Sequence, residues 1–227
     1  MYAGALLLAA LALATAPAAP ARGQGVLEHL NIDRLRLEAV GGGFGTTKPA
    51  RMIGTRLYEL HADYGEISPH WRVIFTATYW GSRYTDAVVR EFLDTLRSVI
   101  TDPSGDDTIR AGPITVSDVE VGGDLRWSPA AAHAALQPWL GGGLAGHVVN
   151  AEGRLIKGTF VEHALDNIAV GVGAGAGLDL AIASHLIVGL QARYDLLSGG
   201  RFGSLRATGT WRFDTSPNDA PAPGSGQ

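Results

Sequence analysis

Apolar and polar residues alternate along much of this chain, and the clearest case is residues 168–182. There the even positions from Ile168 to Ile182 are all apolar, whereas the odd positions are Ala, Gly or Asp179. Because a β-strand sends successive side chains to opposite faces, one face of this stretch is entirely hydrocarbon. The stretch is longer than the usual strand of roughly 5–6 residues and long enough to cross a bilayer, which takes about 9–11 tilted residues.

The same period of two recurs in seven further segments. We expect strands at about 31–40, 51–65, 70–80, 114–127, 136–149, 185–196 and 202–213, in addition to 168–182. The gaps after the second, fourth and sixth strands are short, whereas the third and fifth strands are followed by long connections at 81–113 and 150–167. Short turns that alternate with longer loops are typical of an outer-membrane barrel with its short turns in the periplasm.

The polar faces of these strands carry arginines and carboxylates in similar number, and no lysine. The planar guanidinium satisfies several acceptors at once, which suits enclosed ion pairs. We therefore expect a polar network inside a closed barrel and an apolar face toward lipid, since an open sheet would leave unpaired edges there. The predicted lumen network comprises Arg34, Arg36, Glu38, Glu59, Asp63, Arg72, Asp118, Glu120, Asp124, Arg126, Asp179, Arg193, Asp195, Arg206 and Arg212.

Aromatic and glycine residues refine this picture. Aromatics lie near the predicted strand ends, as in the interfacial girdles of membrane barrels, at Trp71, Trp80, Trp127, Tyr64, Tyr79, Tyr194 and Trp211. The glycines at 171–177 and 141–143 remove side chains from the inner face, which either widens the lumen or leaves room for bulky Arg and Trp. The glycine run at 41–45 is expected to mark a hairpin or a glycine-lined wall.

With these strands the chain resembles the small eight-stranded outer-membrane barrels, the porin-like group that contains the OmpA transmembrane domain and the OmpW-like proteins, over about residues 30–214. The resemblance implies an all-β, eight-stranded antiparallel transmembrane β-barrel, a monomer among the lipids of a Gram-negative cell outer membrane. The last strand, 206–213, is similar to the assembly signal that the barrel insertion machinery reads, although Thr208 stands where that family usually has Gly.

Composition adds the boundaries of the barrel. Residues 3–14 are a short apolar run followed by Pro and small residues, so residues 1–23 are expected to be a secretory signal peptide. Residues 215–227 are rich in Pro, Ser and Gly and are expected to be a disordered tail. The net charge of −4 gives no reason to expect a nucleic-acid partner, and the absence of Cys excludes thiolate chemistry.

One segment, residues 85–100, switches to helical periodicity inside the long loop after the third strand. Val88, Phe92 and Leu96 form its apolar stripe, and Thr85 or Asp86 can cap its N-terminus. Two roles are open for this helix. It either covers the barrel mouth or rests at the lipid interface, or it acts as a gate or partner-binding element.

The sequence offers little evidence for a catalytic site. The segment 160–167 is similar to the Glu-His segment of lipid A deacylases, which implies an enzyme, but no Ser nucleophile closely follows His163. We assign no catalytic, cofactor-binding or metal-binding residues. The first hypothesis is therefore a non-enzymatic barrel with a largely filled lumen and a structural or loop-mediated role. The second is a narrow channel for small or apolar solutes gated by helix 85–100, and the third is a lipid A-modifying enzyme.

Overall fold

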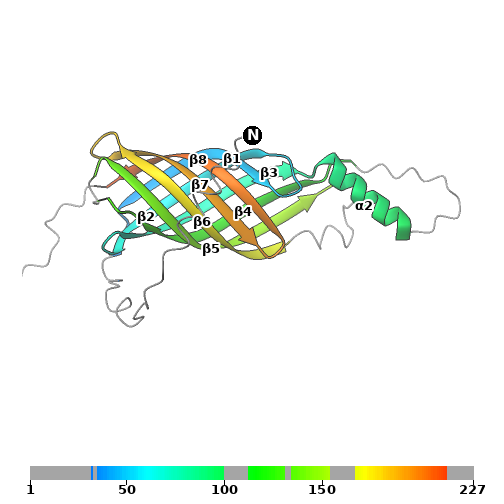
Figure 1. Cartoon of the computed structure of the whole chain (residues 1–227), viewed down its shortest axis with the longest axis horizontal. Coiled ribbons are helices and arrows are strands. Elements are labelled where there is room, and N and C mark those ends of the chain that lie inside the picture. The colour runs from blue at the N-terminus through cyan, green and yellow to red at the C-terminus, as the bar shows by residue number, and fades with distance from the viewer. Residues whose placement is uncertain (1–31, 33–34, 100–111, 131–133, 154–166, 214–227) are drawn as a thin grey trace, which may run out of the picture. The chain divides into compact units, whose positions relative to one another are not determined.

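Eight strands form a closed antiparallel barrel (Figure 1). The computed structural model describes residues 32, 35–99, 112–130, 134–153 and 167–213. Within them each strand pairs with its neighbours in the chain, and the first closes the barrel by pairing with the last. The expected eight-stranded antiparallel barrel is confirmed. The strands are β1 (Ala39–Pro49), β2 (Thr55–Ser68), β3 (Trp71–Arg83), β4 (Thr115–Trp127), β5 (Leu136–Glu152), β6 (Asn167–Ala181), β7 (Leu186–Leu197) and β8 (Gly200–Arg212).

The two ends of the barrel differ in their connections. At one end β2 and β3 are joined by residues 69–70, β4 and β5 by 128–135, and β6 and β7 by 182–185. The start of β1 and the end of β8 meet at the same end, where Ala39 pairs with Arg212. We call this the periplasmic end, because short turns face the periplasm in outer-membrane barrels. The opposite, outer end carries the connections 50–54, 84–114, 153–166 and 198–199.

Strand β1 lies further along the chain than the alternation of residues 31–40 predicts. It begins only at Ala39 and runs through the glycine-rich stretch, so the first predicted strand was wrong. Ala39, which the prediction placed on the outward face, points inward and is buried. Glycine is required here. A Cβ at Gly41 would clash with the His61 ring and the Gly209 carbonyl, and one at Gly43 would lie 2.8 Å from the Ala207 carbonyl oxygen. Glycine has a low strand propensity and contributes no apolar side chain, so the alternation of apolar and polar residues does not reveal this strand.

A β-bulge interrupts β2 near the periplasmic end. The pairing of β2 with β3 shifts register between Asp63 and Glu66, and Gly65 between them has φ 81°. The Gly65 N–H donates a hydrogen bond of 2.8 Å to the Asp63 carboxylate. Only glycine adopts this backbone conformation without strain, so Gly65 fixes the bulge and the position of that carboxylate.

The loop after β3 contains the expected helix, α2 (Asp86–Val99). The Val88 and Val89 amides donate to the Thr85 carbonyl at 3.0 and 3.1 Å, and Asp86 supplies a negative charge in the first turn. An exposed ion pair of 2.6 Å between Arg51 and Glu91 connects the helix to the β1–β2 loop. In the part of the chain that the structure describes, no helix has the length and apolar character needed to cross a membrane.

Candidate functional site: the filled lumen and the apolar belt

The centre of the lumen is an ion-pair network around Glu59 and Arg206, two buried side chains on β2 and β8. The Arg206 Nη1 atom donates to Glu59 Oε2 at 2.6 Å, and its Nε donates to Ser204 Oγ at 3.1 Å. Glu59 also accepts a hydrogen bond from Gln191 at 2.7 Å and contacts His61 Nδ1 at 3.1 Å. Three strands, β2, β7 and β8, therefore meet at one carboxylate.

A second arginine, Arg193 on β7, contacts carboxylates of its own strand and of β4. Its Nη1 donates to Asp124 at 2.6 Å and its Nε to Asp195 at 2.7 Å, while Glu120 lies 3.9 Å from its Nη2. Near these groups the fully buried His147 pairs with Asp118 at 3.0 Å. Burial of charged groups is tolerated best when they are paired. Asp124 and Asp195 each accept a hydrogen bond from Arg193, whereas the buried Glu120 accepts none and has only the longer contact with this arginine.

The periplasmic end of the lumen has its own cluster. Arg72 donates to Asp63 at 3.0 Å and to Glu38 at 2.8 Å, so it joins β3 to β2 and to the segment before β1. The Arg126 guanidinium lies 4.1 Å from the centre of the Trp139 ring, a cation–π contact. Arg126 and Asp179 border a cavity of about 50 Å³ between the two clusters, which Arg212 also lines.

The outer end of the lumen is filled by apolar side chains, which we call the apolar plug. It consists of the buried Leu57, Trp80, Ile114, Val116, Ala151 and Phe202, with Met52, Tyr84, Val149 and Leu197 packed against them. The Trp80 and Phe202 rings meet edge to face at 5.7 Å. Burial raises the pKa of the Tyr84 phenol above its ordinary value, although the nearby Arg51 opposes this shift.

These layers leave little free space along the barrel axis. Between the Arg206 and Arg193 groups the remaining cavity measures about 10 Å³, which is at the lower limit for one water molecule. The lumen of an eight-stranded barrel is just wide enough for side chains to fill, and here they fill it apart from small cavities such as those of about 10 and 50 Å³.

The structure gathers most of the predicted lumen residues inside the barrel. Glu38, Glu59, Asp63, Arg72, Asp118, Glu120, Asp124, Arg126, Asp179, Arg193, Asp195, Arg206 and Arg212 all belong to the clusters or line the cavities described above. Arg36 does not, because it precedes β1 and is exposed, so its expected inward position is wrong. Arg34 lies outside the described residues.

The helix stripe is less well defined. Val88 and Phe92 are half-buried, whereas Leu93, which the predicted stripe omits, is buried. The side chain of Leu96 and the whole of residues 1–31, 154–166 (which include His163) and 214–227 lie outside the described part of the chain.

Neutral lumen residues are what the sequence analysis missed. Gln191, Ser204 and Thr210 complete the hydrogen bonds of the charged groups, and the apolar plug replaces charge altogether at the outer end. Their inward positions follow from the period of two, but their residue types gave no reason to single them out. Trp80 was wrongly assigned to the lipid girdle, since it is buried in the plug.

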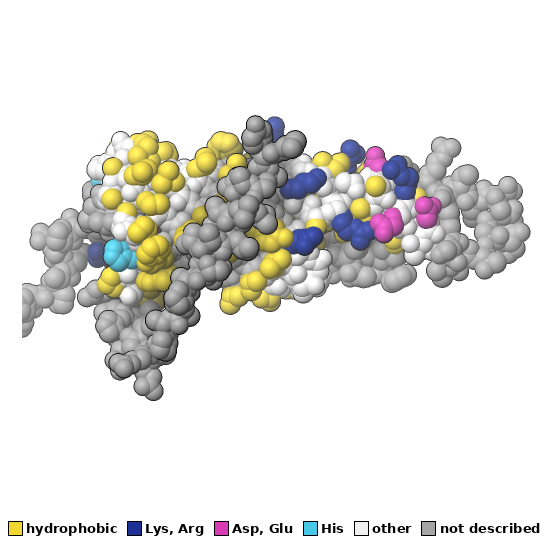
Figure 2. Space-filling view, viewed as in Figure 1, with side chains coloured by type: hydrophobic (Ala, Val, Ile, Leu, Met, Phe, Trp, Pro, Cys, Tyr) yellow, Lys and Arg dark blue, Asp and Glu magenta, His cyan; other side chains and the backbone are white. Residues whose placement is uncertain are grey.

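The outward face carries an apolar belt (Figure 2). Ile168, Phe44 and Leu60 expose 80%, 69% and 69% of their surface, far more contiguous apolar surface than a soluble monomer shows. From Ile168 to Leu180 the belt follows β6 for about 40 Å, which at a tilt of about 45° covers about 28 Å of bilayer.

Aromatic pairs border this belt at both ends. Trp71 and Trp127 are paired in register at the periplasmic end, and Tyr58 and Tyr79 are paired toward the outer end. All four side chains are exposed. Closed strand pairing, an outward apolar belt and two aromatic girdles together define a transmembrane β-barrel of the outer-membrane type.

Comparison with known proteins agrees with this class. No family model and no curated protein matches the chain. Among solved structures it is similar to Neisserial surface protein A (NspA), at 13% identity and a TM-score of 0.52, over 77% of this chain and 96% of that one. It also matches Ail, the attachment invasion locus protein of Yersinia pestis (12% identity, 78% and 97% covered, TM-score 0.44), and the N-terminal β-barrel domain of Pseudomonas aeruginosa OprF (12%, 77% and 98%, 0.42). The likeness to NspA shows a shared fold.

Proposed function

We propose that this protein is a sealed, non-enzymatic outer-membrane barrel whose role is structural or is carried out by its outer loops. The observation that carries the proposal is the filling of the lumen by the ion-pair network and the apolar plug. Side chains surround the cavity of about 10 Å³ in this part of the lumen, so a hydrated ion would have to break pairs such as Glu59 with Arg206 to pass.

The plug also bears on the alternative of a channel gated by helix 85–100. The plug residues come from β2, β3, β4, β5, β7, β8 and the loops next to them, and none of its described members belongs to α2. Removal of α2 is therefore expected to leave the lumen closed. If α2 were a gate, its removal would open the lumen.

Single-channel recording tests both statements. The protein is extracted from the outer membrane of a Gram-negative expression host, reconstituted into planar bilayers, and compared with a variant in which residues 86–99 are replaced by a Gly/Ser linker. We expect no steady currents from either protein, while a general porin recorded in the same bilayers conducts. Steady channels in the native protein would overturn the sealed barrel. Channels that open only in the linker variant would establish α2 as the gate.

A further inference from the structure

A wide depression lies on the outward face of the barrel near the outer end of β8, β1, β2 and β3. Its volume is about 980 Å³, and we call it the rim groove. Its lining includes Lys48, Arg56, Tyr58, Tyr79 and Leu205. The groove therefore begins at the outer girdle of the apolar belt and continues away from it toward the outer loops.

Small residues make the groove hollow. Gly54, Gly81 and Gly203 line it and place no side chain over the strands. Nothing fills the space above them closely, since a Cβ at Gly203 would have its nearest neighbour, Tyr194 Cδ2, 3.7 Å away. Strand pairing sets Lys48 opposite Gly203, so the lysine stands beside this open floor.

The groove is positively charged. Lys48 and Arg56 are exposed, and none of the described residues that line the groove is acidic. The Lys48 ammonium donates one hydrogen bond of 2.9 Å to the Met52 carbonyl, which leaves two of its three donors available. Arg56 has no hydrogen bond or ion pair within the described part of the chain, and the exposed Arg201 follows on β8, two residues before Gly203. An anion is the complementary ligand.

The lower border of the groove is apolar. Tyr58, Tyr79 and Leu205 expose about half of their surface and belong to the belt that faces lipid. A ligand that covers the whole groove therefore has an anionic headgroup above and acyl chains below. That is the chemistry of a charged membrane lipid rather than of a soluble anion.

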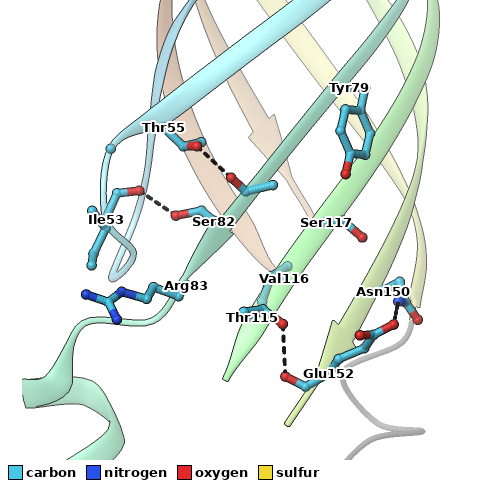
Figure 3. A pocket seen from close by; sticks show the side chains of 12 residues that line it. Ile53, Thr55, Tyr79, Ser82, Arg83, Thr115, Val116, Ser117, Asn150 and Glu152 are labelled. Carbon is cyan, nitrogen blue, oxygen red and sulfur yellow. Dashed lines mark hydrogen bonds between the residues drawn. The ribbon is translucent and has the colours of Figure 1, made fainter. Parts of the chain in front are cut away.

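A second depression, of about 540 Å³, adjoins the groove over β3, β4 and β5 (Figure 3). The two share Gly54, Thr55, Tyr79 and Gly81. The Tyr79 ring, the Ser117 hydroxyl and the Asn150 amide line it, and the charged Arg83 and Glu152 line it as well. The Asn150 amide donates a hydrogen bond of 3.3 Å to the Glu152 carboxylate. An aromatic ring next to hydroxyl, amide and carboxylate groups suits the ring and the hydroxyls of a sugar.

We propose that the rim groove binds a phosphorylated glycolipid of the outer leaflet. Its phosphate lies against Lys48 and Arg56, its acyl chains follow Tyr58 and Leu205, and its sugar extends toward Ser117 and Asn150. This assignment depends on the membrane position of the barrel and is independent of whether the lumen conducts.

Binding of lipid A in two forms tests the proposal. The full-length protein purified in a zwitterionic detergent is titrated with bisphosphorylated lipid A and with its enzymatically dephosphorylated form, and bound lipid is counted by native mass spectrometry. Each basic residue at an anionic surface contributes about 1 kcal/mol, so two residues correspond to a preference of about 30-fold for the phosphorylated form. The variant Lys48→Gln/Arg56→Gln should lose this preference, and its folding is checked by the heat-dependent shift of the band on SDS gels.

Matched variants separate the groove from general charge. Arg36→Gln/Arg90→Gln removes the same charge from exposed sites elsewhere and should keep the preference. Gly203→Leu fills the floor and should weaken binding of both lipid forms. Equal affinity for the two forms, or an unchanged preference in folded Lys48→Gln/Arg56→Gln, overturns the proposal. Full displacement of the lipid by inorganic pyrophosphate also overturns it, because the site would then recognise a free anion.

Discussion

Removal of the Arg206 side chain is the most direct test of the lumen network. Arg206 is 2% exposed and donates to Glu59 at 2.6 Å and to Ser204 at 3.1 Å. Breaking a buried ion pair by removing one partner costs about 3–5 kcal/mol, because the other charge is left without its counter-ion. Glu59 keeps its bonds to Gln191 and His61, so we expect Arg206→Ala to lower the free energy of unfolding by about 3 kcal/mol, at the lower end of that range.

The assay is urea unfolding of the refolded barrel in detergent micelles, followed by tryptophan fluorescence. Arg201→Ala is the matched control, since it removes an exposed arginine from the same strand and should change stability by less than about 0.5 kcal/mol. Glu59→Gln/Arg206→Met removes both charges together and should recover most of the loss, to within about 1.5 kcal/mol of the native protein. If Arg206→Ala costs less than about 1 kcal/mol, or the double variant costs as much as Arg206→Ala alone, the ion pair does not stabilise the lumen.

Two further predictions use the same unfolding assay. Val172 faces lipid near the middle of β6, so Val172→Arg should lower the free energy of unfolding by about 2–4 kcal/mol. A Cβ at the inward Gly173 would clash with Arg193 and Asp195, so Gly173→Val should lower it by at least about 1–3 kcal/mol, whereas the outward Ala174→Val should leave it nearly unchanged. If Ala174→Val were the more destabilising of these two, the inward and outward faces of β6 would be assigned the wrong way round. The Tyr84 phenol has a raised pKa in the folded protein, so its contribution is fully present below its unfolded pKa near 10 and is lost as the pH rises through the higher folded value. The native protein should therefore lose stability above about pH 10 more steeply than Tyr84→Phe, and parallel pH profiles would show that the phenol is not buried in the plug.

How much of this molecule the sequence predicts depends on how strongly each strand contrasts its two faces. In β6, from Ile168 onward, every outward residue is apolar and every inward one is Gly, Ala or Asp, so its faces are unambiguous. In β1 three of the inward residues are glycines, and the true strand is less visible than the false alternation before it. The closed barrel nevertheless follows, because seven of the strands were located and an antiparallel barrel that begins and ends in the periplasm needs an even number of them.

The candidate site is harder to predict because a lumen position does not require a charged residue. Trp80 and Phe202 point inward at the outer end, where they bury apolar surface against each other. An aromatic residue near a strand end fits a lipid girdle equally well on composition, and one residue of register decides between the two. The register of the adjacent strands β2 and β3 pairs Trp80 with Leu57 on the inward face, and the burial of both side chains identifies the plug.

The inward glycines decide between the two roles that the sequence left open for them. A Cβ at Gly177 would lie 2.5 Å from the Trp139 ring, and one at Gly173 would clash with the Arg193 guanidinium. The large side chains of Trp139 on β5 and Arg193 on β7, the two strands that flank β6, therefore already occupy the space above these glycines. A barrel of eight strands has a fixed internal width, so each large polar residue needs a small residue beside it. The glycine rows make room for the network, which supports the proposed sealed barrel over a channel.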